Sequence, residues 1–215
     1  MSQLQDAIEG LYAAFAKVRK PRHIEACPCC QSSEEIAILL SKEVRSISAD
    51  EISRYASSAI WTVGTSADYL YFLPRILEIH SFYPDFIPIP ESTAGQICRT
   101  SLQDWPAPRL QALENYVRQI LNNALSPDSH HRIDSWMCAA SILGFDIRVH
   151  LNAIGRMRPA VLVYFNANAS TLPERLLSNS YWHLPNESHD VIVDWFYSPP
   201  IKKLVFDAYG YVFND

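Results

Sequence analysis

Apolar residues recur along most of this chain at the spacing of an α-helix, and this periodicity constrains the fold more than any other feature. Near the N-terminus the steps between apolar residues alternate between four and three, at Leu4, Ile8, Leu11, Phe15 and Val18. Residues spaced in this way lie on one face of a helix and form a stripe that packs against a neighbour. Few segments alternate between apolar and polar residues as a half-buried strand does. The sequence therefore predicts an all-α fold.

Capping sequences and prolines indicate where the helices begin and end. Ser32–Glu35 and Ser48–Glu51 both have the Ser-x-x-Glu form of a capping box, and Pro74 is expected to begin a new helix. We expect roughly nine to eleven helices in one compact domain covering residues 1–215, with helix pairs stacked as in helical-repeat proteins. If the domain has two lobes, they should meet near residues 86–105.

Charge and hydropathy exclude several classes of function. The 215 residues carry a formal net charge of −5, whereas nucleic-acid binding normally requires a basic face. We find no apolar run of the roughly 20 residues that a transmembrane helix needs, and the N-terminus does not have the pattern of a secretory signal. We therefore expect a cytoplasmic protein without a nucleic-acid or membrane partner. The odd number of cysteines, five, fits a reducing compartment.

Three of the five cysteines lie within four positions, in Cys27-Pro28-Cys29-Cys30. Cys27 and Cys30 have the separation of a metal-binding or redox pair, and His23 precedes them by a few residues. A zinc site needs four ligands, so Cys29, His23 or a remote residue such as His80 would have to complete it. The alternatives are a redox pair ahead of a helix and a proline-pinned structural turn. The ligand count favours the structural turn, so we expect no obligatory cofactor and keep zinc at Cys27 and Cys30 as the metal hypothesis.

A resemblance to a known family is carried by Leu11-Tyr12 with Phe15, by Cys27-Pro28-Cys29-Cys30, by Tyr55-Ala56 with Thr62-Val63-Gly64, and by Phe72-Leu73-Pro74-Arg75-Ile76-Leu77-Glu78. With these segments the chain resembles an uncharacterised family of bacterial cytosolic all-helical proteins, most clearly over residues 11–80. The family usually has an aromatic residue before the glycine, where this chain has Val63. It has no established activity, so the resemblance implies an all-helical fold and no catalytic residue.

One arrangement of residues is typical of an enzyme. His189-Asp190 is an adjacent pair, with His150 upstream and Asp207 downstream, and these residue types hold metals in helical phosphohydrolases. However, the whole set falls in the last third of the chain, and Ser188-His189-Asp190 also fits the start of a helix. The sequence has no Gly-rich phosphate loop and no Gly-x-Ser-x-Gly or His-Glu-x-x-His motif. We therefore expect a non-enzymatic protein and keep a metal-dependent helical hydrolase using His189 and Asp190 as the alternative.

Other residues favour a role in protein binding. Arginine outnumbers lysine, and aromatic residues make up 12% of the chain; arginine and aromatic residues are enriched at protein interfaces. Phe86, Ile87 and Ile89 lie between prolines in a stiff connector, where they either fill a groove or contact a partner. Arg75 lies between apolar positions, where it either pairs with Asp68 in a structural clasp or projects into a binding groove.

The most specific hypothesis is an immunity or antitoxin-like protein that inhibits a bacterial toxin. The mild acidity of the chain would complement a basic toxin. The expected contact residues are Phe86, Ile87 and Ile89, followed by Arg75.

Overall fold

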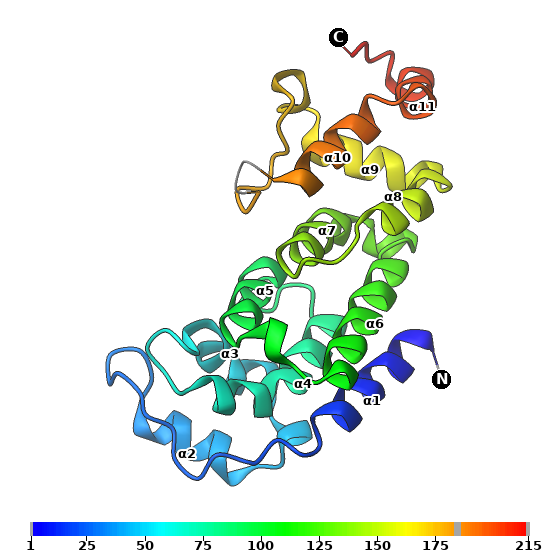
Figure 1. Ribbon diagram of the computed structural model, residues 1–215. Helices are drawn as coiled ribbons and strands as arrows, with labels where there is room; N and C mark the ends of the chain where they lie inside the picture. The colour runs from blue at the N-terminus through cyan, green and yellow to red at the C-terminus, as the bar shows by residue number, and fades with distance from the viewer. Residues whose placement is uncertain (1, 183–185, 214–215) are drawn as a thin grey trace. The chain divides into compact units, whose positions relative to one another are not determined.

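A computed structural model describes residues 2–182 and 186–213, and helices make up most of this range (Figure 1). The described residues contain eleven α-helices, which confirms the prediction of an all-α fold with roughly nine to eleven. Their β-structure amounts to two isolated bridges, which join Val63 to Ala26 and to Ala59. Within the same ranges, no helix combines the length and the hydropathy that crossing a bilayer would require.

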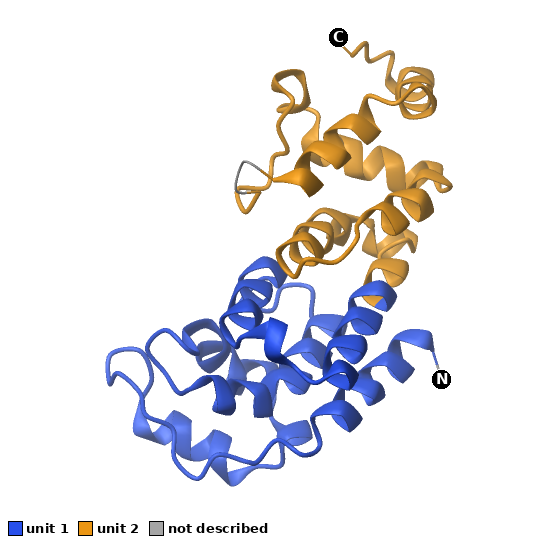
Figure 2. Ribbon diagram, in the orientation of Figure 1, with its two compact units in different colours: residues 1–119 blue, residues 120–215 orange. Residues whose placement is uncertain are grey.

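Contacts within the chain divide it into two compact units, residues 1–119 and 120–215 (Figure 2). The boundary lies inside α6 (Ala107–Asn123), which comes later in the chain than the segment 86–105 where two lobes were expected to meet. Each unit has its own set of fully buried apolar side chains.

Unit 1 is built around α4, against which α1 and α3 pack. Tyr69, Phe72 and Ile76 of α4 are completely buried. The other elements of the unit are α2, α5, the first part of α6 and two short 3-10 segments. The bounds are α1 Gln3–Phe15, α2 Ser33–Ser41, α3 Ala49–Ser58, α4 Ser66–Phe82 and α5 Pro90–Arg99, with 3-10 turns at Val44–Ser46 and Leu102–Asp104.

Both predicted capping boxes are present in unit 1. The backbone N–H of Ser32 donates to Glu35 Oε2 over 2.8 Å, and that of Ser48 donates to Glu51 Oε2 over 2.9 Å. A third box, formed by Thr65 and Asp68, begins α4. These boxes fix where α2, α3 and α4 begin because each satisfies backbone donors that no helical carbonyl reaches.

The expectation that Pro74 begins a new helix was wrong. Pro74 lies inside α4 and is buried, as are Leu73 and Ile76 beside it. Proline removes one backbone hydrogen bond and strains the preceding turn. Burial of this apolar face in the core of unit 1 offsets that cost, so α4 continues through the proline.

Unit 2 is organised around α9, which contacts α7, α8 and α11. Its core is aromatic: the ring centroids of Tyr164 and Phe196 lie 5.1 Å apart, and those of Phe165 and Phe196 lie 6.4 Å apart. The bounds are α7 Ile133–Ile142, α8 Arg148–Gly155, α9 Arg158–Asn168, α10 Glu187–Phe196 and α11 Pro199–Tyr209, with 3-10 turns at Pro127–Arg132 and Leu172–Glu174.

Candidate metal site

The cysteine-rich segment forms a closed turn that is held from two sides. The backbone N–H groups of Cys30 and Gln31 both donate to the carbonyl of Cys27, over 2.9 and 3.1 Å. The Cys27 N–H donates to the Thr62 carbonyl over 2.9 Å, and Arg54 Nε donates to the Cys30 carbonyl over 2.6 Å. The turn is therefore fastened to α3 and to the segment that follows it, which limits the motion of the three thiols.

The turn brings all three thiols together at the surface. The Sγ atoms of Cys27, Cys29 and Cys30 all lie within 4.8 Å of one another. The distance from Cys27 to Cys29 is 2.8 Å and that from Cys29 to Cys30 is 3.8 Å. Both are longer than the roughly 2.05 Å of a disulfide, so the three thiols are free. Ligands at about 2.3 Å from a tetrahedral ion lie about 3.8 Å apart, and small side-chain rotations would bring the cluster to that geometry.

Hydrogen bonding within the cluster makes the thiols ionise unequally. A hydrogen bond from Cys29 lowers the pKa of Cys27, whereas the same contact raises the pKa of Cys29 to about 11. Cys27 therefore becomes a thiolate more readily than Cys29, which is its hydrogen-bond donor. Loss of a second proton places like charges close together, and a bound cation would remove that penalty.

The histidines considered as further ligands do not join the cluster. His23 lines a neighbouring pocket. His80 is buried in the core, where its Nε2 atom lies 3.0 Å from Thr93 Oγ1 and its ring packs against Phe86. Among the described residues, the cysteine cluster is the only group of three or more His, Cys, Asp or Glu side chains with converging ligand atoms. The chain thus offers three sulfur ligands, which leaves the fourth position of a tetrahedral ion for water or an outside donor.

Arg75 takes part in a structural clasp, but its partner is not Asp68. Its Nε atom donates to the Ile47 carbonyl over 2.7 Å, and its Nη1 atom donates to Glu78 Oε2 over 2.7 Å. Tyr12 also donates to Glu78 Oε2, over 2.6 Å. Asp68 instead caps the start of α4. The guanidinium is thus held among α1, α4 and the segment before α3.

The apolar residues of the proline-rich connector after α4 differ in their exposure to solvent. Phe86 is buried against the His80 ring, whereas Ile87 and Ile89 are exposed. Phe82 and Tyr83, at the end of α4, are exposed beside them. We call Phe82, Tyr83, Ile87 and Ile89 the 82–89 surface.

A groove runs along this region, with a volume of about 350 Å³. It is bordered by two carboxylates, Asp50 and Asp85, and by Phe82, Tyr83 and Ile87 of the 82–89 surface. The exposure of Phe82 and Tyr83 could not be predicted from the sequence, because the two residues continue the apolar pattern of α4.

The His189 set does not converge on a common point. His189 is buried beside Trp182, and its Nδ1 atom lies 3.0 Å from Asp190 Oδ1. Asp207 pairs with Lys203 within α11. His150 lines a different, small pocket of α8. Asn186 caps α10, because its side chain accepts from the His189 N–H. The segment around His189 and Asp190 is therefore the start of a helix, which is the alternative that the sequence analysis considered.

Comparisons with known proteins found no matching family model, no matching curated protein and no matching solved structure. The family resemblance of residues 11–80 therefore stays a prediction, and the function is argued from the geometry of the chain itself.

Proposed function

We propose that this protein binds a thiophilic metal ion, with zinc as the first ion to test, through Cys27, Cys29 and Cys30. The observation that carries the proposal is the convergence of three free thiols within 4.8 Å on a fastened turn. Thiolate ligands select zinc, copper(I) and other soft ions over magnesium and calcium. Cys29 is exposed and its two neighbours are partly exposed, so an ion can reach the sulfurs from solvent.

Binding at this turn should release protons, because thiols bind metals as thiolates. Cys27 supplies a sulfur that ionises more readily than that of Cys29, and the incoming cation favours ionisation of Cys29, whose pKa is about 11 before binding. The apparent metal affinity should therefore rise as the pH rises.

Cobalt(II) titration tests the proposal, since thiolate–cobalt charge-transfer absorption reports sulfur coordination. We expect one equivalent of Co²⁺ to saturate the reduced full-length chain and one equivalent of Zn²⁺ to displace it. Cys29→Ser should weaken binding by at least about tenfold, because one sulfur ligand is lost. Cys98→Ser is the matched control, since Cys98 is a half-buried thiol of α5 outside the turn. Absence of charge-transfer absorption, or identical titrations for Cys29→Ser and the unmodified chain, would overturn the proposal.

We also propose a protein partner for the 82–89 surface. The carrying observation is that Phe82, Tyr83 and Ile87 are 57%, 55% and 61% exposed, with Ile89 at 41% beside them. Large exposed apolar groups that lie together mark interaction sites. The carboxylates of Asp50 and Asp85 border the same groove, so the complementary surface is apolar with a cationic flank. A basic toxin inhibited by an immunity-like protein would present such a surface.

Affinity measurements with a purified, identified partner test this second proposal. Ile87→Asp should weaken binding at least tenfold, and added salt should slow association because it screens the acidic flank. Val149→Asp is the control, since Val149 is a similarly exposed apolar residue of α8. Equal affinity of Ile87→Asp and Val149→Asp would exclude the 82–89 surface as the contact. Phe86→Ala is a poor probe because Phe86 is in the core.

A further inference from the structure

Gln31 is a buried polar residue whose side-chain amide has no hydrogen-bond partner among the described residues. Its side chain follows the cysteine turn directly and the residue is 1% exposed, yet neither Oε1 nor Nε2 has a hydrogen-bond partner among the described residues. An amide buried without partners costs free energy, and nearly all buried side-chain polar atoms in proteins are paired. The two atoms of Gln31 therefore mark a position where a complementary donor and acceptor are expected.

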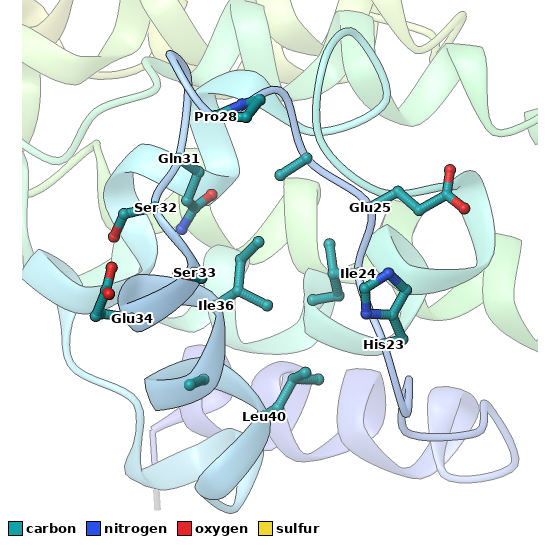
Figure 3. A pocket seen from close by; sticks show the side chains of 12 residues that line it. His23, Ile24, Glu25, Pro28, Gln31, Ser32, Ser33, Glu34, Ile36 and Leu40 are labelled. Atoms are coloured by element: carbon teal, nitrogen blue, oxygen red, sulfur yellow. The ribbon is translucent and has the colours of Figure 1, made fainter.

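Gln31 lines a pocket with a volume of about 700 Å³, although the two polar atoms of its amide are themselves closed off from solvent. Figure 3 shows its side chain directed toward a space bordered by Ile24, Ile36 and Leu40. Ala26 and Ala37 complete the apolar wall. Helix α2 contributes Ile36 and Leu40, which are partly exposed, whereas Leu39 between them is buried. The volume falls in the range of roughly 300–1,000 Å³ typical of small-molecule sites.

The charged residues at the rim select against anions. Glu25 and Glu34 line the pocket, and both are exposed. A hydrogen bond from its own backbone N–H lowers the pKa of Glu34, so that carboxylate is ionised at neutral pH. A negatively charged ligand would be repelled here, whereas a neutral one would not.

We infer that this pocket binds a small, neutral, mainly apolar molecule that carries a carboxamide or a lactam. The apolar body would lie against Ile24, Ile36 and Leu40. The Gln31 side chain would turn toward the ligand, whose N–H would donate to Oε1 and whose carbonyl would accept from Nε2, so that both orphaned atoms are paired. This site uses none of the cysteine sulfurs and is independent of the proposed metal.

Three related probes test the inference on the full-length, ¹⁵N-labelled chain. Hexanamide has the donor, the acceptor and an apolar tail; N,N-dimethylhexanamide has no donor; hexanoate is anionic at pH 7. We expect hexanamide to shift the Gln31 side-chain NH₂ signals and the backbone amides of residues 24–40 in a saturable way. N,N-dimethylhexanamide should bind at least about fivefold more weakly, since it leaves Gln31 Oε1 unpaired. Hexanoate should bind more weakly than hexanamide.

Two variants separate recognition by Gln31 from non-specific binding. Gln31→Leu removes the amide at similar volume, so it should bind hexanamide at least about fivefold more weakly and no longer distinguish it from the dimethyl probe. Ala37→Trp should block all three probes, because Ala37 lines the pocket from an exposed position and can be enlarged without disturbing the core. Shifts that are scattered over the chain would overturn the inference. Equal affinity of Gln31→Leu and the unmodified chain for hexanamide would overturn it as well.

Discussion

At the scale of single residues, the clasp around Glu78 shows how unit 1 accommodates charge near its core. Glu78 Oε2 accepts from both Arg75 and Tyr12, and the two charged side chains are 18% and 15% exposed. Burial, followed by the hydrogen bond to Glu78, raises the pKa of Tyr12, so the phenol remains a donor at neutral pH. Such a network joins α1 to α4, and its removal leaves several polar groups without partners.

We expect Glu78→Ala to lower the free energy of unfolding by about 1–3 kcal/mol, since Tyr12 loses the acceptor of its hydroxyl and Arg75 loses one of its two acceptors. Glu9→Ala is the control, because it removes an ion pair with Arg45 in which both side chains are more than two-fifths exposed. That change should cost less than about 1 kcal/mol. Urea denaturation monitored by circular dichroism measures both. Equal costs for the two variants would contradict the structural role of the Glu78 clasp.

The residue scale also shows what the sequence alone could predict of the site. The spacing of Cys27 and Cys30 indicated a metal ligand pair, but Cys29 joins them only because the turn folds back on the Cys27 carbonyl. The burial of Gln31 could not be predicted, because a polar residue before a capping serine is normally exposed. Phe86 looked like a contact residue, yet a turn closed by its N–H on the Tyr83 carbonyl directs it into the core.

At the scale of elements, the capping residues determine where α2 and α3 begin, whereas tertiary packing determines whether α4 continues through its proline. The serine caps of α2 and α3 follow from four consecutive residues and were predictable. The continuity of α4 through Pro74 was not, because it depends on burial against segments far away in the sequence.

We expect Ser48→Ala to destabilise the chain by about 1 kcal/mol, since it removes the side-chain cap of α3. Ser57→Ala is the matched control: Ser57 is exposed inside the same helix, and its hydroxyl donates only to the Ser53 carbonyl. Alanine is the stronger helix former, so this variant should be neutral or slightly stabilised. Thermal denaturation of the three chains gives the comparison. A cost for Ser57→Ala equal to that for Ser48→Ala would contradict the capping role.

The capping box formed by Ser48 and Glu51 also predicts that the stability of the chain depends on pH. Hydrogen bonds from Lys42 and then from the Ser48 backbone lower the pKa of Glu51 to about 2, from an ordinary value of 4.5. The depressed pKa means that Glu51 contributes stability at pH values above 4.5 and that this contribution is lost as the pH falls toward about 2. The stability difference between the unmodified chain and Glu51→Gln should therefore be constant near neutral pH and shrink over this acidic window. Denaturation at several pH values measures it, and a difference that grew on acidification would have the wrong sign.

At the scale of the whole molecule, the all-α class followed from apolar periodicity, whereas the position of the boundary between the two units did not. The boundary at residues 119 and 120 falls inside α6, a continuous helix of 17 residues. Leu113 and Val117 are buried before the boundary, and Ile120 and Leu121 are buried after it. Apolar residues are thus buried on both sides of the boundary, and no glycine, proline or polar linker marks the change from one unit to the other.

Because each unit has its own core, a metal bound at the cysteine turn should stabilise unit 1 selectively. Binding only to the folded state adds about 2.7 kcal/mol at a free metal concentration of 100 times Kd. The turn is tied to Thr62 and Arg54, so the gain should spread through α2 and α3. We expect hydrogen exchange measured by mass spectrometry to show slower exchange in peptides from residues 24–64 after zinc addition, with peptides from residues 130–182 unchanged. Cys29→Ser should abolish the difference. Equal protection of both regions would show that the two units unfold together, and unchanged exchange in residues 24–64 at saturating zinc would show that the turn is not coupled to its surroundings.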